Sequence, residues 1–558
     1  MPRVINLQTS FNSGVLDPRL AARTDLKHFY QGAAVAENVQ SLPQGGMKRR
    51  PGFRFIDDID ERARLASFAF NVEQTYLMVF TDGNCAIYKD GALQAVITTP
   101  WVASELYDLQ WTQSADTMIV VHENHPPQKI VRGSSHSSWT CSDITLTNIP
   151  QWSFGTTTDE NVWSATRGWP KSVTFYQGRL WFGGSKDRPQ TLWGSKTNDF
   201  FNFDFGDSLD DEAISITLDT DQVNAITSVY AGRHLLIFTT GGEFSIHDAP
   251  ITPALSAVKR QTLFGSRNIP PKSIDGSTLF VDRSGKSVRE FVFAYSEDAY
   301  TSGTVSLLAS HLLNSPVDMD ASRGTATSDA NYVYFVNGDG TVAVFNTLRA
   351  QEVGGWTQWR TAGEVEGVAV VVEDVYFLVK RVINGETVRY LEMLDADTYT
   401  DACRKIDDQS GIAVAGLAHL NGEECRVRAD NSVMSNKTPI GGAIVIEREA
   451  ETVEVGLNFT TRVQTMPINM DFQDGPTLTR KKRIVKVVAN LYESLGVSVN
   501  NEYMVDRSFG TALGQSVDPY TGIKELYLMG WTELAQVEIT QDDPLPMTIL
   551  GLGVEVEA

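Results

Sequence analysis

The chain has few of the residues and motifs that would indicate a particular chemistry. It holds four cysteines in 558 residues, and no two of them have the Cys-x-x-Cys spacing of a metal or redox site. We therefore expect free thiols, as in a protein made in a reducing cytosol. No apolar run reaches the roughly 18 residues that a membrane-spanning helix needs. The opening residues 1–8 contain no apolar core of signal-peptide length, so we expect no membrane insertion by this chain itself.

The common enzyme fingerprints are missing as well. The sequence contains no Gly-x-Ser-x-Gly elbow, no Walker loop and no dinucleotide-binding glycine pattern. The Ser-x-Asp-x-Gly-x-Thr-Trp box of bacterial sialidases, which are built on propellers, does not occur either. We therefore expect no catalytic residues, no cofactor and no resident metal.

Positive charge is scarce. Lysine and arginine number 47 against 69 aspartates and glutamates, which gives a formal net charge of −22. A protein that grips DNA by its phosphates needs the opposite balance. The acidic balance indicates a chain that is simply soluble, or one that repels polyanions passing close by.

Short hairpins are what the chain has in abundance. Seven times, an apolar or β-branched run meets a tight Gly/Asp/Asn turn and is followed by a second extended run. The clearest copies span residues 76–88, 235–246, 279–289 and 332–345, and weaker ones span 118–132, 173–182 and 375–391. Successive copies start roughly 40–60 residues apart, a spacing typical of propeller blades. We predict a β-propeller of about six to eight blades over residues 57–400.

The segments on either side of the hairpins have a different pattern. Residues 1–56 predict an N-terminal arm, with an amphipathic helix over residues 24–39 and a capped helix start at Asp17-Pro18. Residues 401–558 keep strand-like runs without the period, which predicts a β-rich domain resembling a sandwich or a small barrel. Alternatively, the last strand closes the propeller ring against an early strand. The predicted fold class is all-β.

Several stretches, in their order along the chain, resemble one protein family. They are Phe11–Leu26, Asn38–Phe53, Trp111–Asp116, His122–Pro127, Phe175–Ser185, Trp193–Phe203, Gly416–Gly422 and Asp542–Gly551. Together they resemble the tail nozzle proteins (tail tubular protein B) of short-tailed bacteriophages, the podoviruses. The matches run nearly from end to end, and their order is more specific than any one of them.

The resemblance implies a structural virion protein that is made in the bacterial host cytoplasm. It implies a homohexameric tube below a dodecameric head-tail adaptor ring, with tail fibres or tailspikes as further partners. It also implies transient, non-specific contact with the double-stranded DNA that leaves through the channel. Two alternatives come from other classes: a glycan- or protein-binding propeller that acts as a receptor-binding tail protein, and a glycan-degrading tail enzyme.

Two groups of residues are candidates for contacts. The apolar face of the arm predicts an adaptor or inter-subunit interface, or else packing on the chain's own propeller. Its residues are Phe11, Leu16, Pro18, Arg19, Leu20, Leu26 and Phe29. A basic run, Arg480, Lys481, Lys482 and Arg483, predicts contact with an acidic subunit or with DNA, or a plain solvated surface, since four charges are costly to bury. A second basic run, Lys48–Arg50, predicts the same contacts with DNA or with an acidic neighbouring subunit.

Two further stretches have some character of metal ligands. His122 and His125 are three residues apart, but no matching Cys or His pair accompanies them, and we favour a turn or packing role. Residues 199–212 are dense in carboxylates but lack the spacing of a calcium loop. The phenylalanines interleaved among those carboxylates predict a loop that is pinned to the body.

Overall fold

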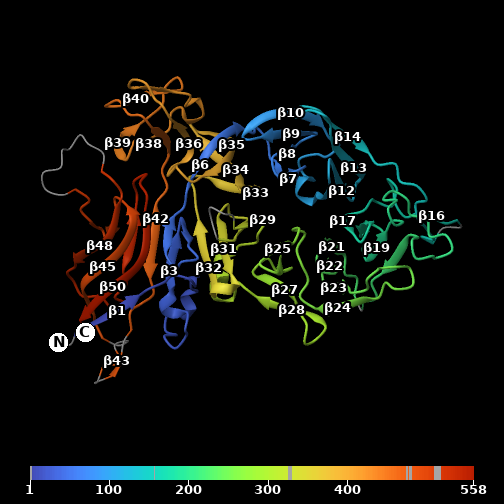
Figure 1. Ribbon diagram of the computed structural model, residues 1–558, viewed down its shortest axis with the longest axis horizontal. Helices are drawn as coiled ribbons and strands as arrows, with labels where there is room; N and C mark the ends of the chain where they lie inside the picture. The colour runs from blue at the N-terminus through green and yellow to red at the C-terminus, as the bar shows by residue number, and fades with distance from the viewer. Residues whose placement is uncertain are drawn as a thin grey trace.

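The computed structural model describes residues 3–155, 158–220, 222–324, 330–469, 471–472, 475–476, 480–507 and 517–557. The regular structure of these residues is β-strand, accompanied only by short 3-10 helices. Figure 1 shows a ring of small sheets at the right and a sandwich of longer strands at the left, where both chain ends lie. The fold is all-β, as predicted.

Seven four-stranded antiparallel units follow one another around the ring; five are separate sheets, and the sixth and seventh are parts of larger sheets. The first three are β7–β10 (Arg64–Ala69, Thr75–Thr81, Asn84–Lys89, Ala92–Thr98), β11–β14 (Gln110–Ser114, Thr117–His122, His125–Arg132, Trp139–Asp143) and β17–β20 (Ser172–Tyr176, Arg179–Gly183, Thr191–Gly194, Ile214–Thr217). The next two are β21–β24 (Ile226–Ala231, Leu235–Thr239, Glu243–Ile246, Val258–Thr262) and β25–β28 (Lys272–Ile274, Ser277–Val281, Val288–Ala294, Ala299–Thr304). The sixth is β29–β32 (Asp318–Ser322, Tyr332–Val336, Val342–Leu348, Val353–Trp359). The seventh is β33–β35 (Glu364–Val371, Asp374–Ile383, Glu386–Asp395) together with β6 (Gly52–Asp58). Each unit is one propeller blade.

Each of the seven hairpins predicted from the sequence lies in its own blade. The turn between β34 and β35, for example, is Asn384-Gly385, with φ values of 49° and 82°. Two positive φ angles in succession are what a two-residue hairpin turn requires, and glycine and asparagine adopt them at low cost.

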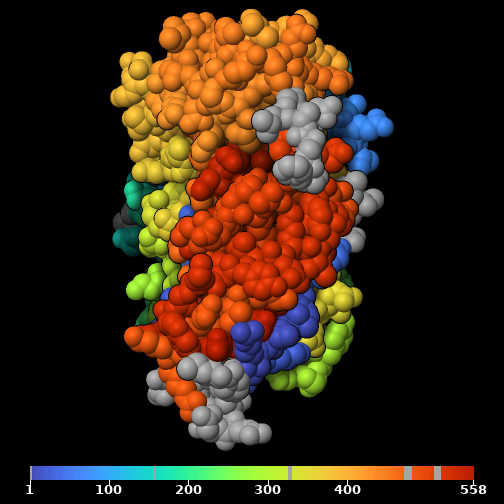
Figure 2. Space-filling view, turned by 90° about the vertical axis from the view of Figure 1, so that its left-hand side faces the viewer, coloured from blue at the N-terminus to red at the C-terminus, as the bar shows by residue number. Residues whose placement is uncertain are grey.

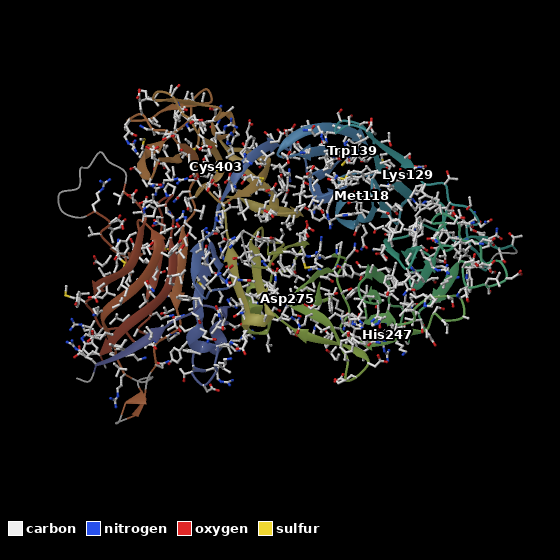
Figure 3. The ribbon with its side chains drawn as sticks, viewed as in Figure 1. Met118, Lys129, Trp139, His247, Asp275 and Cys403 are labelled. Carbon is white, nitrogen blue, oxygen red and sulfur yellow. The ribbon has the colours of Figure 1, made fainter. Side chains whose placement is uncertain are left out.

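Burial on both faces explains why the strands of a blade read as nearly continuous apolar runs. Along β8, Tyr76, Met78 and Phe80 pack toward the second blade, whereas Leu77 and Val79 pack toward the seventh. Alternate side chains of a strand point to opposite faces, so each blade contributes to two seams. Met118 and Trp139 of the second blade lie in the seam with the first (Figure 3). Trp101 and Trp139 are therefore seam residues.

The ring closes with a strand from the N-terminal segment. β6 pairs antiparallel with β35 and forms the outer strand of the seventh blade, and the chain then enters the first blade at β7. Leu65 and Leu77 of the first blade pack against Ala369 and Leu378 of the seventh. An early strand thus completes the last blade. β6 begins at Gly52, which is before the predicted boundary at residue 57.

The sandwich combines strands from both ends of the sequence. One sheet contains β1 (Arg3–Gln8), β4 (Val39–Ser41), β5 (Met47–Arg49), β45 (Arg483–Ser494), β48 (Tyr520–Tyr527) and β50 (Thr548–Glu557). The second sheet continues from β32 of the sixth blade through β2 (Gly14–Val15), β3 (Gly32–Glu37), β42 (Thr461–Thr465), β49 (Glu538–Gln541), β46 (Ser498–Val499) and β47 (Glu502–Tyr503). A single apolar cluster spans both sheets and the seam between the fifth and sixth blades. The sandwich and the propeller therefore share a core.

The predicted helical arm is wrong. Asp17 does cap a turn, because its carboxylate accepts the N–H of Arg19, but only the 3-10 turn η1 (Pro18–Leu20) follows. A second turn, η2 (Phe29–Gln31), leads directly into strand β3 in place of the helix predicted over residues 24–39. β3 lies between β2 and β42, so the hydrogen bonds and burial offered by two neighbouring strands override the local helical pattern.

Residues 401–457 form a small lobe beside the seventh blade, at the upper left of Figure 1. Its strands are β36 (Asp401–Ile406), β41 (Val453–Leu457), β38 (Cys425–Ala429) and β39 (Ser432–Lys437), with β37 (Ala413–Ala415) and β40 (Ala443–Val445). β36 pairs with β6 in parallel through Cys403, and the apolar core of the lobe also contains Ile383 and Tyr390 of the seventh blade. Figure 3 labels Cys403 in this lobe. All four cysteines are free thiols, as expected.

A buried ion pair lies where the ring, the lobe and the sandwich meet. The guanidinium of Arg50 donates to both carboxylate oxygens of Asp401 at 2.8 and 2.6 Å, and both side chains have no exposed surface. Arg50 also donates to Asn38 Oδ1 at 3.0 Å and stacks over Phe459 at 3.7 Å. These contacts join the segment between β5 and β6 to the first residue of β36.

We expect Asp401→Asn to lower the free energy of unfolding by about 3–5 kcal/mol, because Arg50 would remain buried without its counter-charge. Chemical denaturation followed by tryptophan fluorescence measures the loss. The control is Asp25→Asn, which breaks the fully exposed pair with Arg23 and should leave the denaturation midpoint unchanged. Equal midpoints for the Asp401 variant and the wild type would contradict a central role for the pair.

His419 makes the stability depend on pH. Burial lowers the pKa of this imidazole to about 4, although its Nε2 contacts the carbonyl oxygen of Ala402 at 2.9 Å, and the ring stacks on Phe55. The unfolded chain, with the ordinary histidine pKa near 6.5, then binds the proton more tightly than the folded chain. Stability is therefore fully present above about pH 6.5 and declines as the pH falls toward 4, by up to about 3 kcal/mol.

His419→Gln should flatten this decline, because an amide can donate to the Ala402 carbonyl without titrating. Unfolding curves of both proteins at pH 7, 5.5 and 4.5 measure the difference, and the remaining histidines contribute equally to both. Identical pH slopes would show that His419 is not the titrating group.

Candidate functional site

The first candidate site lies on the propeller axis. A cavity of about 310 Å³ is lined by residues from the innermost strand of every blade, among them Arg64, Gln110, Thr174, Ser228, Lys272, Asp318 and Val368. Innermost strands meet only at the axis, so the ring geometry gathers these side chains from seven distant parts of the sequence.

Charges at the axis are paired across blades. Arg64 Nη2 lies 3.3 Å from Asp318 Oδ1, and Lys272 Nζ lies 2.6 Å from Asp320 Oδ1. The Asp318 carboxylate also accepts the N–H of Val368. Burial raises the pKa of Asp318 above its usual value, and the charge of Arg64 opposes that rise. Within the described residues, Arg64 Nε is buried without a hydrogen-bond acceptor.

The Lys272–Asp320 pair joins neighbouring blades, the Arg64–Asp318 pair spans the axis between blades that are not adjacent, and together they leave only a small polar space. Asp318 and Asp320 are both on β29 of the sixth blade, whereas Arg64 is on β7 of the first and Lys272 on β25 of the fifth. A volume of this size lies at the lower end of the range for small-molecule pockets, roughly 300–1,000 Å³. It is far too small for a DNA duplex.

The arm residues predicted as an interface are divided between the interior and the surface. Phe11, Leu16 and Phe29 are fully buried in the chain's own core. Leu20 and Leu26 pack around Leu16 and Phe29, and Leu308, from the connection between the fifth and sixth blades, packs there as well. Only Pro18 and Arg19 are exposed. In this conformation the apolar face of the arm packs between the sandwich and the propeller. Of the predicted interface residues, only the two exposed ones in the turn η1 are accessible to a partner.

The basic run at residues 480–483 is not a uniform surface patch. Lys481 is exposed, and Arg480 and Arg483 are partly buried. Lys482, however, is 1% exposed, and its ammonium group donates to the Ile468 carbonyl at 3.0 Å and to Asn469 Oδ1 at 2.7 Å. Burial lowers the pKa of Lys482. The expectation that these charges all face solvent or a partner is therefore wrong for Lys482.

Lys48–Arg50 differs from the prediction in the same way. Arg49 and Arg50 are both fully buried, and burial lowers the pKa of Arg49 to about 9. Arg49 donates to the carbonyls of Gln541 and Phe459 at 2.8 and 3.0 Å, which links β5 to the C-terminal strands. Neither arginine is available to DNA.

The loop at residues 199–212 is pinned as predicted. Phe203 is buried, and Phe200, Phe201 and Phe205 pack against the same cluster between the second and third blades. The carboxylate of Glu212 accepts the N–H of Leu209 at 2.8 Å, so that it closes the loop on itself.

The outer face of the sandwich exposes apolar side chains that sequence reasoning missed. Ile5 and Leu7 on β1 are 69% and 65% exposed, and Ile523 and Tyr527 on β48 are 62% and 70% exposed. The strand register places Tyr527, Lys486, Glu555 and Ile5 in one row across four strands. Figure 2 faces this sheet: β45, β48 and β50 lie in the red area in the middle of the view, whereas β1 is blue. We call these four apolar residues the sandwich patch.

Apolar residues an even number of positions apart in β1 and β48, and therefore on one face of each strand, were the sequence signal for this patch. The other face of these strands also carries apolar residues, so the sequence alone does not tell which face is buried; the register with β45 and β50 decides it. Exposed apolar residues on the two flanking strands, with Lys486 and Glu555 on the strands between them, give this face a mixed apolar and charged surface of the kind found at interaction sites.

Among known proteins, the chain is similar in structure to propeller proteins. No family model matches the sequence, and no curated protein matches it. Among solved structures, the chain is similar to RRP9 WD40 repeats, with 8% identity and a TM-score of 0.39 over 62% of this chain and 99% of that one. It is also similar to U3-55K, with 8% identity and a TM-score of 0.37 over 61% and 99% of the two chains. A third is the C-terminal WD40 domain of Sif2, with 8% identity and a TM-score of 0.34 over 62% and 99%.

No helix in the described part of the chain is long and apolar enough to cross a membrane.

The two axial aspartates provide a matched test of the paired charges. We expect Asp318→Asn to lower the free energy of unfolding by about 3 kcal/mol or more, because Arg64 is buried and would lose its counter-charge. Asp320→Asn should cost less than about 1 kcal/mol, because the ammonium group of Lys272 is partly exposed and water can replace its partner. Chemical denaturation measures both, and equal losses would contradict this account of the axis.

Proposed function

We propose that this chain is a structural subunit of the tail nozzle of a short-tailed bacteriophage. In this proposal the chain assembles into a ring below a head-tail adaptor. The family resemblance implies that the ring is a hexamer. Double-stranded DNA leaves through the lumen of that ring, and tail fibres or tailspikes bind its outer surface. The proposal assigns the chain a virion location and no catalysis.

The sandwich patch is the observation that carries the proposal. A sheet that exposes Ile5, Leu7, Ile523 and Tyr527 on one face is costly in water unless a partner covers it. Lys486, Glu525 and Glu555 lie among these residues, so the face also offers charges of both signs to a partner. A second copy of the chain or the adaptor meets both requirements.

The axial cavity limits where a conduit could run. In this proposal DNA passes through a lumen that several chains enclose, because about 310 Å³ inside one propeller cannot admit a duplex. With a net charge of −22 per chain, the wall of such a lumen would repel phosphates and keep the duplex mobile. Arg49, Arg50 and Lys482 are buried, so these three cations are not available to bind the duplex.

A receptor-binding propeller is the second candidate. The observation that favours it is the same cavity, whose wall holds Gln110, Ser228 and the donor Arg64 Nε without an acceptor in the described residues. Such a cavity suits a small polar group, such as a sugar hydroxyl or one side chain of a protein partner. A glycan-degrading enzyme would also need a general acid and a second carboxylate at matched spacing, whereas the axial carboxylates are held in ion pairs.

Charge placed on the sandwich patch should block assembly. We expect the double variant Ile523→Asp and Tyr527→Asp to lose ring formation on adaptor complexes while it stays folded, since both side chains face solvent in the free chain. Light scattering and particle imaging, with and without a purified dodecameric adaptor ring, provide the measurement. The matched control is Leu93→Asp with Val96→Asp on β10, where two apolar side chains are similarly exposed on the propeller.

Rings formed equally well by the sandwich variant and the wild type would refute the patch as the assembly surface. A wild-type chain that stays monomeric with adaptors present would refute the nozzle itself. Saturable binding of a capsular glycan by that monomer would then establish the second candidate.

A further inference from the structure

Three potential metal ligands meet at the edge of the second blade. Glu105 Oε2 lies 2.8 Å from His125 Nε2, and Glu105 Oε1 lies 4.0 Å from His122 Nδ1. One ligand atom from each of the three side chains lies within 4.8 Å of the other two. Within the described residues this is the one such cluster of histidine, cysteine and acidic side chains. The sequence showed the two histidines but not the carboxylate, which comes from a different element.

Local structure fixes all three side chains. His122 and His125 face each other across the tight turn between β12 and β13 and form a register pair. Glu105 stands at the start of the 3-10 turn η3 (Leu106–Asp108), in the connection from the first blade to the second. Its carboxylate accepts the Val102 N–H at 3.2 Å and the Asn124 side-chain amide at 3.1 Å.

The β12–β13 turn, which carries the histidines, is also held in place by its own contacts. The carbonyl of Glu123 accepts the N–H of Trp169 at 2.8 Å, which connects the turn to the segment before the third blade. His122 is 3% exposed, and its Nδ1 accepts the backbone N–H of Asn124 at 3.2 Å. That hydrogen bond requires Nδ1 to be unprotonated, and this nitrogen lies 4.0 Å from Glu105 Oε1. The lone pair of this nitrogen is the one that a metal would use in place of the N–H.

We propose that Glu105, His122 and His125 bind one divalent transition-metal ion, with zinc as the best fit. Two imidazoles and one carboxylate form a borderline ligand set, which favours zinc and its neighbours over calcium or magnesium. Bonds of about 2.0–2.2 Å place tetrahedral ligands roughly 3–3.5 Å apart. The Glu105–His125 contact of 2.8 Å would therefore lengthen slightly, and ligand atoms now up to 4.8 Å apart would approach by up to roughly 1.5 Å. Three protein ligands leave the fourth position to water.

The position of the site assigns it a structural role. The ion would fasten the connection that leaves the first blade to the hairpin of the second blade, across the seam that contains Trp101 and Met118. Glu105 and His125 are partly exposed, so the ion can enter from solvent without opening this seam. The inference is independent of the proposed function, because it needs only the folded propeller.

The test is calorimetric titration of the full chain with zinc chloride after treatment with a chelator. We expect one ion per chain. Saturation should raise the melting temperature by at least about 2 °C, since a ligand that binds only the folded state stabilises it. Cobalt(II) chloride in place of zinc should give the visible absorption of a four-coordinate site.

Variants locate the ion. His125→Ala and Glu105→Gln should each weaken zinc binding at least tenfold and abolish the cobalt spectrum. The matched control His28→Ala removes an exposed histidine elsewhere and should leave both unchanged. Circular dichroism of each variant without metal verifies that the propeller is folded. Absence of zinc binding by the wild type, or binding that survives both cluster variants, would overturn the proposal.

Discussion

The Arg50–Asp401 ion pair is the constraint on which the arrangement of the molecule depends. A charge with no exposed surface is tolerated only with a partner in good geometry, and here the two partners are 351 positions apart in the sequence. Arg50 is on the strand connection that leaves the sandwich, and Asp401 begins the lobe. Because the pair is bidentate and also stacked on Phe459, it sets both the distance and the orientation of these parts. β6 follows directly and closes the ring, so the position of the last blade depends on the same contact.

In the rest of the molecule, ion pairs connect separate blades, while apolar side chains fill the seams between adjacent blades. The axial pair of Arg64 and Asp318 connects the first and sixth blades around the central cavity, whereas the wedge between adjacent blades is aromatic and aliphatic. Apolar packing is non-directional and would accept several registers. The paired charges are directional, which makes them suited to selecting one register among those that packing allows.

The sequence predicted the local structure of the propeller well, because a blade is built from contacts close in sequence. Hairpin turns such as Asn384-Gly385 are encoded by the residues that form them. Elements formed by distant partners could not be predicted in this way. Residues 24–39 have a helical pattern, yet β3 is a strand because β2 and β42 lie on either side of it. Lys482, Arg49 and Arg50 looked like surface charges because their acceptors are far away in sequence or are backbone carbonyls.

The pairing of the first strand with the last has a consequence for synthesis on the ribosome. β1 pairs with β50 from Arg3↔Glu557 to Gln8↔Leu552. β1 therefore waits, unpaired, until β50 has been made, while each blade can form as soon as its own four strands are available. Phe11 lacks part of its core until β50 is present, and Leu16 and Phe29 lack theirs until Met466 has been made. Exposed apolar segments of this kind are where nascent chains aggregate and where chaperones bind. The interval between the synthesis of β1 and that of β50 is set by their separation in the sequence. It is thus the stage of synthesis at which this protein is most prone to aggregate.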